Sequence, residues 1–408
     1  MDISFVRNKF PGLRDDFIFM DNAGGSQVLG TVIARTVDYF KKYYVQLGAT
    51  YEVSAQASAK LQGSVKELAA FINAKDPREL IVGPASSMLL RILSICISRQ
   101  WKLGDEVIVT NSDHEANVSC WTDLQEKGIV IKIWKLDPDT LEFNPDDLRN
   151  LLSSRTRLVA MCHVSNILGT INPVKEVAKI VHDAGALICV DGVAYAPHRM
   201  IDVQETDVDF YVFSTYKVFG PHLAVMFGKY HLLREMDGIN HYFFTKDDVP
   251  YKFQPGNVNF ELTYSLGAIP EYFANLHDHH FPLETGISSP EKYKKSFDLI
   301  SRHEEQLSIL ILGYLKTKKK IRIIGDTTGD KQKRVPTISF VHQSYRSSEV
   351  VSGMDKFHIG IRYGDFYAKK IIHDLGLVEN DGVIRISLVH YNTKEEVGKL
   401  VENLKQIL

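Results

Sequence analysis

The stretch FSTYKVFGPH, residues 213–222, places Lys217 just beyond an apolar run that extends from Phe210 to Ser214. A short run rich in aromatic and β-branched residues is typical of a buried strand, and Gly220 followed by Pro221 indicates a turn. Lysine is seldom buried without a partner or a function. The stretch therefore predicts a strand of an α/β sheet whose end delivers a functional amine.

Five earlier apolar runs are predicted to be further strands of the same sheet. They are Glu79 to Val82, Glu106 to Thr110, Ile129 to Trp134, Leu158 to Cys162 and Leu187 to Asp191. Amphipathic segments such as Ser86 to Gln100 and Val174 to Ala184 lie between several of them. This alternation of strands and helices predicts a mostly parallel sheet that is covered by helices on both faces.

The pattern changes near Pro282, where helical stretches surround a few strands in the manner of an α+β lobe. The predicted helices are Glu291 to Thr317, Ser348 to Phe357, Tyr367 to Leu375 and Lys394 to Ile407, and the predicted strands are Arg322 to Ile324, Thr337 to Val341 and Val383 to Leu388. A chain of 408 residues exceeds the length of about 250–300 residues at which one hydrophobic core stops growing. We therefore expect a large domain over residues 15–281 and a smaller domain formed by residues 1–14 and 282–408.

The composition is that of an ordinary globular protein, with 44% hydrophobic and 24% charged residues. The net charge of −2 does not suggest a nucleic-acid or membrane partner. The N-terminus lacks an apolar signal region, so we expect a cytoplasmic protein. Four widely spaced cysteines, Cys96, Cys120, Cys162 and Cys189, favour reduced thiols over a disulfide framework or a metal site.

Polar side chains follow most of the predicted strands, where the ligands of open α/β sheets bind. Ser86 and Ser87 open a predicted helix, His114 and Asn166 follow two strands, Asp191 closes another, and Lys217 follows the last. Each has an ordinary alternative, because the serines can be a simple helix cap and the histidine a structural residue. Together, however, they suit a ligand that carries a phosphate, a cationic ring nitrogen and an aldehyde. Pyridoxal 5'-phosphate has these groups, and its enzymes pair a lysine with an acidic residue.

The order and spacing of several motifs resemble those of class V aminotransferases of PLP fold type I. They are DNAGGSQV from Asp21, HEANV, HVSNILGTINPV, VDGVAYAPH, DFYVFSTYKVFGP, FQPGNVN and RISLVHYNTKEEV. Within this family the chain is most similar to group II cysteine desulfurases and selenocysteine lyases, in the subgroup called cysteine desulfurase-like proteins. The resemblance implies a large domain with a mostly parallel seven-stranded sheet, a small α+β domain and a homodimer with active sites at the interface.

The resemblance also assigns roles to individual residues. It implies that Lys217 is the Schiff-base lysine, that Asp191 pairs with the ring nitrogen, that His114 stacks on the ring and that Asn166 binds the ring hydroxyl. It implies phosphate binding by Ser86, Ser87 and Ser214, with Asn257 reaching the phosphate from the neighbouring subunit. Tyr216 departs from the family pattern, but its hydroxyl is still expected to donate to the phosphate. Asn22 and Arg385 are the expected substrate-binding residues, because a guanidinium can grip a carboxylate with two hydrogen bonds. No metal is implied.

The chain departs from the family pattern in the loop Arg362-Tyr363-Gly364-Asp365-Phe366-Tyr367. Relatives that form a persulfide carry a cysteine where Tyr367 stands, since a thiolate must attack the substrate sulfur. Ala194 also stands where many relatives have a ring-contacting Gln or His, and Tyr216 replaces a His. The favoured hypothesis is therefore a lyase that cleaves the C–S or C–Se bond of a cysteine-like substrate without a protein persulfide. An aminotransferase or epimerase acting on an unidentified amino acid is the alternative, and a catalytically weak PLP-binding or scaffold protein is the third hypothesis.

Overall fold

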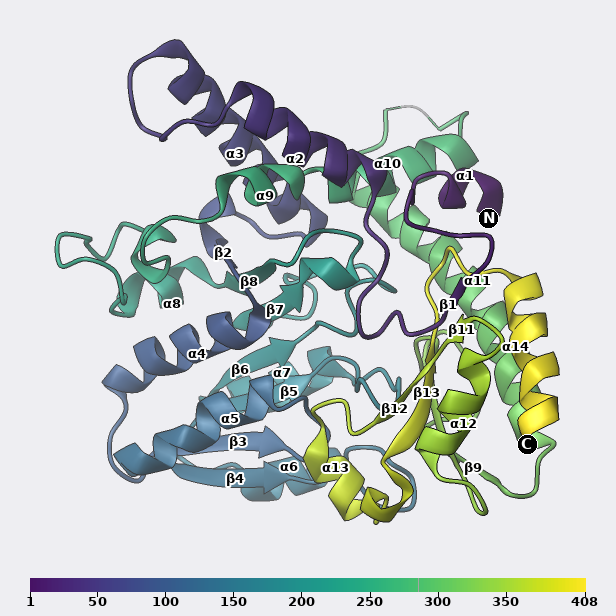
Figure 1. Cartoon of the computed structure of the whole chain (residues 1–408). Helices are drawn as coiled ribbons and strands as arrows, with labels where there is room; N and C mark the ends of the chain where they lie inside the picture. The colour runs from purple at the N-terminus through teal and green to yellow at the C-terminus, as the bar shows by residue number, and fades with distance from the viewer. Residues whose placement is uncertain (285) are drawn as a thin grey trace.

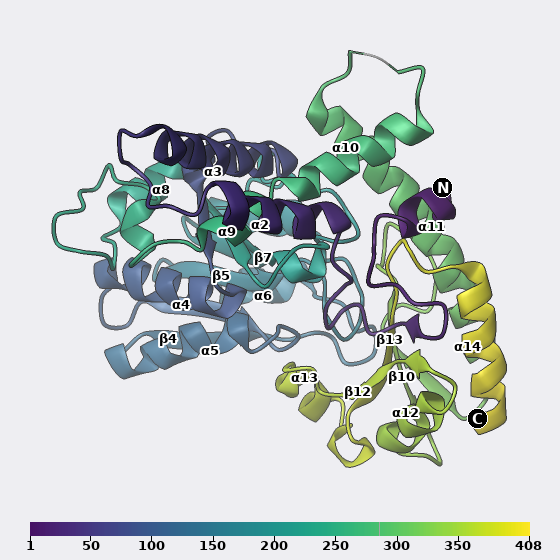
Figure 2. The same cartoon turned by 45° about the horizontal axis from the view of Figure 1, so that its top comes forward.

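The computed structural model describes residues 1–284 and 286–408 and contains two lobes that lie side by side (Figures 1 and 2). The larger lobe is built on a seven-stranded sheet with the order β2-β8-β7-β6-β5-β3-β4. Its strands are β2 (Leu80–Gly83), β3 (Glu106–Thr110), β4 (Val130–Trp134), β5 (Thr156–Cys162), β6 (Leu187–Asp191), β7 (Phe210–Ser214) and β8 (Ala224–Gly228). The predicted mostly parallel sheet is confirmed, and only β8 runs antiparallel to its two neighbours, β2 and β7.

Helices cover both faces of this sheet, as the alternation of the sequence predicts. They are α2 (Gly30–Lys42), α3 (Glu52–Phe71), α4 (Ser86–Ile97), α5 (Ala116–Thr122), α6 (Pro145–Leu151), α7 (Val174–Asp183), α8 (Tyr230–Glu235), α9 (Phe260–Ser265) and α10 (Ala268–His280). Alternate residues of one strand enter opposite cores: Val159 packs with the α7 side and Ala160 with the α4 and α5 side. The strands are therefore buried on both faces, which explains their nearly continuous apolar runs.

The smaller lobe holds a four-stranded sheet with the order β12-β13-β10-β9. Its elements are α11 (Ser289–Lys316), β9 (Ile321–Ile324), β10 (Thr337–His342), α12 (Ser347–Asp355), β11 (Ile359–Gly360), β12 (Arg362–Gly364), α13 (Lys369–Asp374), β13 (Val383–Ser387) and α14 (Lys394–Ile407). The helix predicted to begin at Tyr367 begins at Lys369 instead. Phe366 and Tyr367 have φ angles of 51° and 61°, and this left-handed conformation cannot continue into an α-helix.

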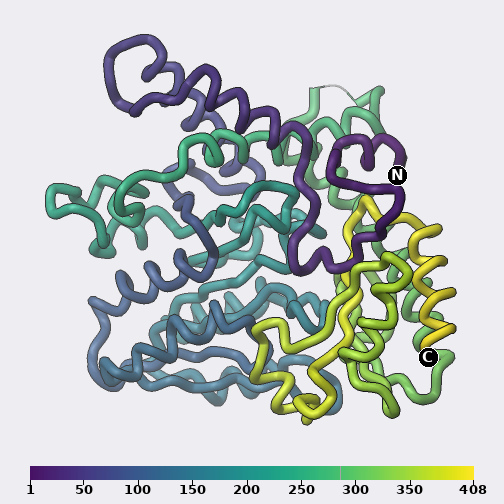
Figure 3. The backbone as a smooth tube through the Cα atoms, in the orientation of Figure 1, coloured from purple at the N-terminus to yellow at the C-terminus, as the bar shows by residue number. Residues whose placement is uncertain are grey.

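The N-terminal segment connects the two lobes (Figure 3). Helix α1 (Ile3–Arg7) lies near α11, and β1 (Ile18–Phe19) pairs in parallel with β11 of the small lobe before the chain enters α2. Residues 18–19 thus pair with the small lobe, although the domain division drawn from the sequence starts the large domain at residue 15. The described part of the chain has no helix long and apolar enough to cross a membrane.

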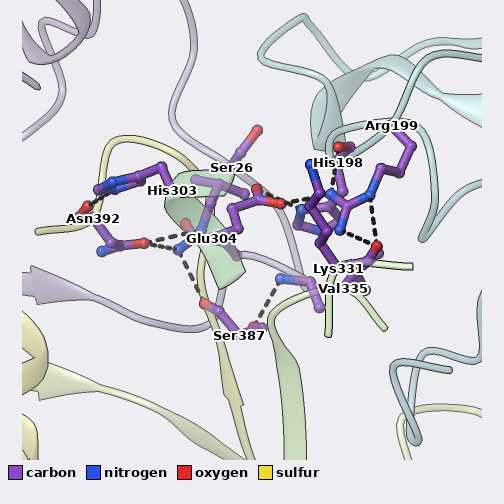
Figure 4. A network of polar contacts seen from close by, with 12 residues as sticks. Ser26, His198, Arg199, His303, Glu304, Lys331, Val335, Ser387 and Asn392 are labelled. Carbon is purple, nitrogen blue, oxygen red and sulfur yellow. Dashed lines mark hydrogen bonds and ion pairs between the residues drawn. The ribbon is translucent and has the colours of Figure 1, made fainter. Parts of the chain in front are cut away.

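A buried polar network holds α11 against the large lobe (Figure 4). Glu304 on α11 accepts a hydrogen bond from His198 at 2.8 Å and pairs with Arg199 at 3.1 Å. Arg199 also donates to the carbonyl groups of Lys331 and Arg334. Buried charges require partners of this kind, and here they fix the position of the small lobe beside the carboxyl ends of the large sheet.

Candidate active site

One cavity at the carboxyl ends of the strands gathers most of the residues that the sequence singles out. It is lined by Ser86, Ser87, His114, Asn166, Asp191, Ser214, Tyr216 and Lys217, together with Ala85, Ala116, Cys162, Val164, Val193 and Ala194. Asn22, Asn257 and Arg385 lie outside this lining. The convergence arises because β5, β6 and β7 are parallel neighbours and end at the same edge of the sheet.

Lys217 is held by a compact turn that begins where β7 ends. The residues Thr215–Lys217 form a short 3-10 turn, and the Thr215 hydroxyl donates to the carbonyl of Pro221 at 2.7 Å. The Ser26 hydroxyl donates to the carbonyl groups of Tyr216 and Lys217, at 3.2 and 3.0 Å. The N-terminal segment therefore fixes the backbone that carries the lysine. Ser26 was missed from the sequence, although it lies in the DNAGGSQV motif.

The Lys217 side chain is buried, with 8% of its surface exposed. Burial, together with the smaller effect of the positive charge of Arg385, lowers its pKa from 10.5 to about 8, and the charges of Asp191 and Asp21 act in the opposite direction. The ammonium is disfavoured because few compensating charges replace its water. A substantial fraction of the amine is consequently neutral near pH 8, as a nucleophile or base requires.

Asp191 closes β6 and is also buried, at 6% exposure. Its Oδ1 accepts the Val193 N–H at 2.9 Å, the single hydrogen bond that the side chain makes to the described residues. Burial raises the pKa of the carboxyl group, and the Val193 N–H and the charge of Lys217 oppose this effect. A buried carboxylate with one oxygen toward a cavity is suited to a cationic ligand atom.

His114 lies at the mouth of the same cavity, immediately before α5. Its Nδ1 accepts the Ala116 N–H at 3.0 Å, which leaves the proton of the neutral ring on Nε2. Burial, reinforced by the positive charges of Lys217 and Arg385, lowers the histidine pKa to about 4. The ring is therefore an uncharged flat surface at neutral pH.

The serines form the opposite end of the cavity. The hydroxyl groups of Ser86 and Ser214 are 2.8 Å apart, and Ser86 is the first residue of the twelve-residue helix α4. Unpaired N–H groups and the positive end of the helix dipole at this position favour a phosphate. Phosphate-binding hydroxyls, a neutral ring, a buried acid and a buried amine together fit pyridoxal phosphate.

Asp113, immediately before His114, supports this edge from behind and was also missed. Its side chain accepts hydrogen bonds from the Asn117 amide at 2.6 Å, from the Cys162 N–H at 3.0 Å and from Thr110. Burial raises the pKa of Asp113 to about 7, against the effect of these donors. The carboxyl group thereby links the ends of β3 and β5 and the start of α5. Asp113 could have been found from the sequence, because it directly precedes His114 and follows the end of β3.

Arg385 lies on β13 of the small lobe and is 2% exposed. Its Nη2 pairs with Oδ1 of Asp21 at 2.9 Å, and its Nη1 donates to the carbonyl oxygen of Asn166 at 3.2 Å. Its Nε is buried and has no hydrogen-bond partner among the described residues. The contact with Asn166, which lines the cavity, places the guanidinium beside the cavity wall.

Two other predicted residues have different surroundings. The Asn22 amide donates to the carbonyl of Ser387 and to Oδ1 of Asn392, each at 3.1 Å, and accepts from the Tyr391 hydroxyl. The amide nitrogen of Asn22 is thus engaged within the protein, and only its oxygen retains a further acceptor site. Asn257 lies in an exposed loop before α9, where a neighbouring subunit could be reached.

Comparisons with known proteins show which family the chain resembles. The sequence profile of the family described as Aminotransferase class-V matches residues 18–281 and 292–400. The aminotransferase-like protein FGM3 of Gibberella zeae is 39% identical over 100% of this chain and 98% of that protein. The cysteine desulfurase-like protein ustD of Aspergillus flavus is 34% identical over 100% of this chain and 91% of that protein. The structure of the cysteine desulfurase CsdA from Escherichia coli has the same fold, with a TM-score of 0.84 and 23% identity over 100% of this chain and 98% of that one.

Proposed function

The chain belongs to the Aminotransferase class-V family and is a pyridoxal-phosphate-dependent enzyme, and we propose that it cleaves the C–S or C–Se bond of a cysteine-like amino acid without a protein persulfide. The observation that carries this proposal is a cavity lined with groups suited to pyridoxal phosphate, together with the absence of a solvent-exposed cysteine. All four cysteines are buried.

The thiol nearest to the chemistry is Cys162, which lines the cavity at the end of β5. Burial raises its pKa well above 9, and the charge of Asp113 raises it further. A thiol that stays protonated is a poor nucleophile and cannot readily take sulfur from a substrate. The position where persulfide-forming relatives carry their cysteine is occupied by Tyr367, which is 65% exposed. Both observations support sulfur release without a persulfide.

Each polar residue of the cavity has a distinct task in this proposal. The cofactor supplies an aldehyde that condenses with amines and a ring that withdraws electrons. Ser86, Ser87, Ser214 and Tyr216 hold its phosphate, Asn166 its ring hydroxyl and Asp191 its ring nitrogen, while His114 covers one face of the ring. Lys217 would hold the aldehyde and, as a neutral amine, would accept the proton from the substrate Cα. Arg385 binds the substrate carboxylate and orients the bonds at Cα.

An aminotransferase is the second candidate, and the 39% identity with an aminotransferase-like protein favours it. The two candidates share the proton transfer at Cα and differ in the product. A lyase releases sulfide from L-cysteine and leaves pyruvate and ammonia after hydrolysis. An aminotransferase converts the amino acid to its keto acid and leaves the amino group on the cofactor.

We therefore expect purified protein incubated with pyridoxal phosphate to show a visible absorption band that Lys217→Ala lacks. With L-cysteine the lyase gives equal amounts of sulfide and pyruvate, and Cys162→Ser retains this activity. L-Alanine provides the matched substrate without a leaving group.

Keto acid and aminated cofactor without sulfide would favour the aminotransferase. Loss of sulfide in Cys162→Ser, with an unchanged absorption band, would contradict the persulfide-free route.

We also propose a homodimer in which Asn257 of each subunit contacts the cofactor phosphate of the other. An apolar stripe supports this proposal. Ile33, Val37, Phe40 and Tyr44 are 44%, 44%, 50% and 68% exposed. The spacing of the first three places them on one face of α2, and the ring of Tyr44, beyond the end of the helix, lies 5.4 Å from that of Phe40. Helix α2 packs on α9, which follows the Asn257 loop. An exposed apolar face of this kind is typical of an interaction surface.

A further inference from the structure

The loop Asp365 to Ala368, between β12 and α13, connects Arg385 to the cavity. The ring of Phe366 lies over the Arg385 guanidinium, with 3.6 Å between the guanidinium carbon and the ring centroid. The Phe366 carbonyl accepts a hydrogen bond from the Asn166 amide at 2.9 Å. One residue therefore contacts both the proposed carboxylate-binding group and a proposed cofactor-binding group.

The backbone of this loop is strained where these contacts form. Phe366 and Tyr367 have φ angles of 51° and 61°, a conformation that costs free energy in residues other than glycine. Hydrogen bonds hold it in place: the Glu115 N–H donates to the Tyr367 carbonyl at 2.7 Å, and the Tyr367 N–H donates to Oδ1 of Asp365 at 2.9 Å. Strain maintained by such contacts is common beside functional sites.

The hydrogen bonds of Arg385 leave a defined part of the guanidinium free. Asp21 and the Asn166 carbonyl engage Nη2 and Nη1, whereas Nε has no partner among the described residues although it is buried. A guanidinium has five N–H groups, all in its plane. A carboxylate binds in this plane, through the Nε–H and the remaining N–H groups, so the orientation of the plane sets the direction from which the carboxylate approaches.

We propose that Phe366 is a positioning residue that fixes the plane of the Arg385 guanidinium and so sets the direction from which the substrate carboxylate binds. The inference rests on the proposed role of Arg385 in substrate binding. The aromatic face is attracted to the cation, most strongly where water is excluded. An aliphatic side chain at position 366 would fill the same space without the aromatic face that attracts the guanidinium.

The binding of propionate to the protein without cofactor tests this proposal, because propionate carries the carboxylate and lacks the reacting amine. Its dissociation constant is measured by calorimetry, with neutral propionamide as the control ligand. We expect Phe366→Leu to weaken propionate binding about 5- to 30-fold, the range that follows from losing a cation–π contact at a desolvated site. Phe366→Tyr keeps the aromatic face and restores binding to within about twofold of the original protein.

Three further variants separate the possible causes of a change. Phe366→Met provides a second aliphatic replacement if Phe366→Leu does not fold. Tyr345→Leu removes another half-exposed aromatic of the small lobe and leaves propionate binding unchanged. Arg385→Lys removes the guanidinium itself and weakens binding. Weak binding in Arg385→Lys but normal binding in both aliphatic variants would refute the role of Phe366 alone. Normal binding in Arg385→Lys as well would overturn the role of Arg385 and the inference with it.

Discussion

Lys217 lies at the end of a strand in the candidate active site and is buried, which is unusual for a lysine. Strands β6 and β7 are parallel neighbours, and their ends place Lys217 near Asp191. The Ser26 hydroxyl donates to the Lys217 carbonyl and fixes its backbone. Because the desolvated ammonium is disfavoured, the amine is available for chemistry at a pH where an exposed lysine is almost fully protonated. The charge of Arg385 contributes in the same direction. Arg385, the proposed carboxylate-binding residue, thus also favours the neutral form of Lys217, the proposed base.

This arrangement predicts the pH dependence of cofactor uptake. Only the neutral amine of Lys217 reacts with an aldehyde, so the rate at which protein without cofactor takes up pyridoxal phosphate should rise with pH and level off above a pKa of about 8. Arg385→Gln removes a neighbouring positive charge and should move the midpoint to higher pH. Stopped-flow absorbance measures the rate. Arg346→Gln removes a small-lobe surface cation and should leave the midpoint in place, and a wild-type midpoint near 10.5 would contradict the prediction.

Individual elements differ in how well the sequence predicts them. The predicted bounds of β3, β6, β7 and α14 agree with the structure, because each is a buried run or an amphipathic stretch with its own local pattern. The carboxyl ends of β6 and β7 then located Asp191 and Lys217. Strand β8 was missed, and with it the antiparallel edge of the sheet.

The substrate end of the site could not be found from local patterns. Arg385 and Asp21 are 364 positions apart in the chain, and no periodicity connects them. The segment from Tyr367 to Leu375 has a helical pattern, but contacts of Phe366 and Tyr367 with the large lobe hold their backbones in a left-handed conformation. Tertiary contacts override the local preference here. The proposed positioning role of Phe366 depends on that override.

A substitution between β12 and β13 tests whether the pairing of these strands positions the Phe366 loop. Gly382, just before β13, has a φ angle of 75°, and a methyl group on it would collide with the backbone of Gly364 in β12. We expect Gly382→Ala to destabilise the protein by about 1–3 kcal/mol and to weaken propionate binding by displacing the Phe366 loop. Urea unfolding and calorimetry measure the two effects.

A second glycine serves as the control for that substitution. Gly398 lies on the exposed side of α14, and a methyl group on it meets no other atom within 4 Å. Gly398→Ala should therefore stabilise the protein by about 0.5–1 kcal/mol through its higher helix propensity. Unchanged stability and binding in Gly382→Ala would show that β12 tolerates displacement and that the loop is not tied to its register.

In the whole molecule, the lobes are joined at several separate places. The network of Glu304, His198 and Arg199 holds α11, the pairing of β1 with β11 anchors the N-terminal segment, and Arg385 reaches across to Asn166. These contacts place Arg385 of the small lobe, the proposed carboxylate-binding residue, beside the proposed cofactor cavity of the large lobe. The proposed dimer would complete the cavity from a third direction, through Asn257.

The apolar stripe on α2 makes this dimer testable. Phe40 is half exposed, so Phe40→Asp should leave the fold intact while placing a charge in the proposed interface, where burying it is costly. We expect the sedimenting mass to fall from twice 46.2 kDa to that of one chain. Pyridoxal phosphate should then dissociate faster, because Asn257 of the other subunit no longer contacts it. Asn257→Ala should accelerate the release of pyridoxal phosphate without changing the mass.

Val378→Asp, at an exposed apolar position of the small lobe, controls for the added charge and should remain dimeric. A wild-type protein that sediments as one chain at micromolar concentration would exclude the shared site, whereas a dimer that persists in Phe40→Asp would place the interface elsewhere.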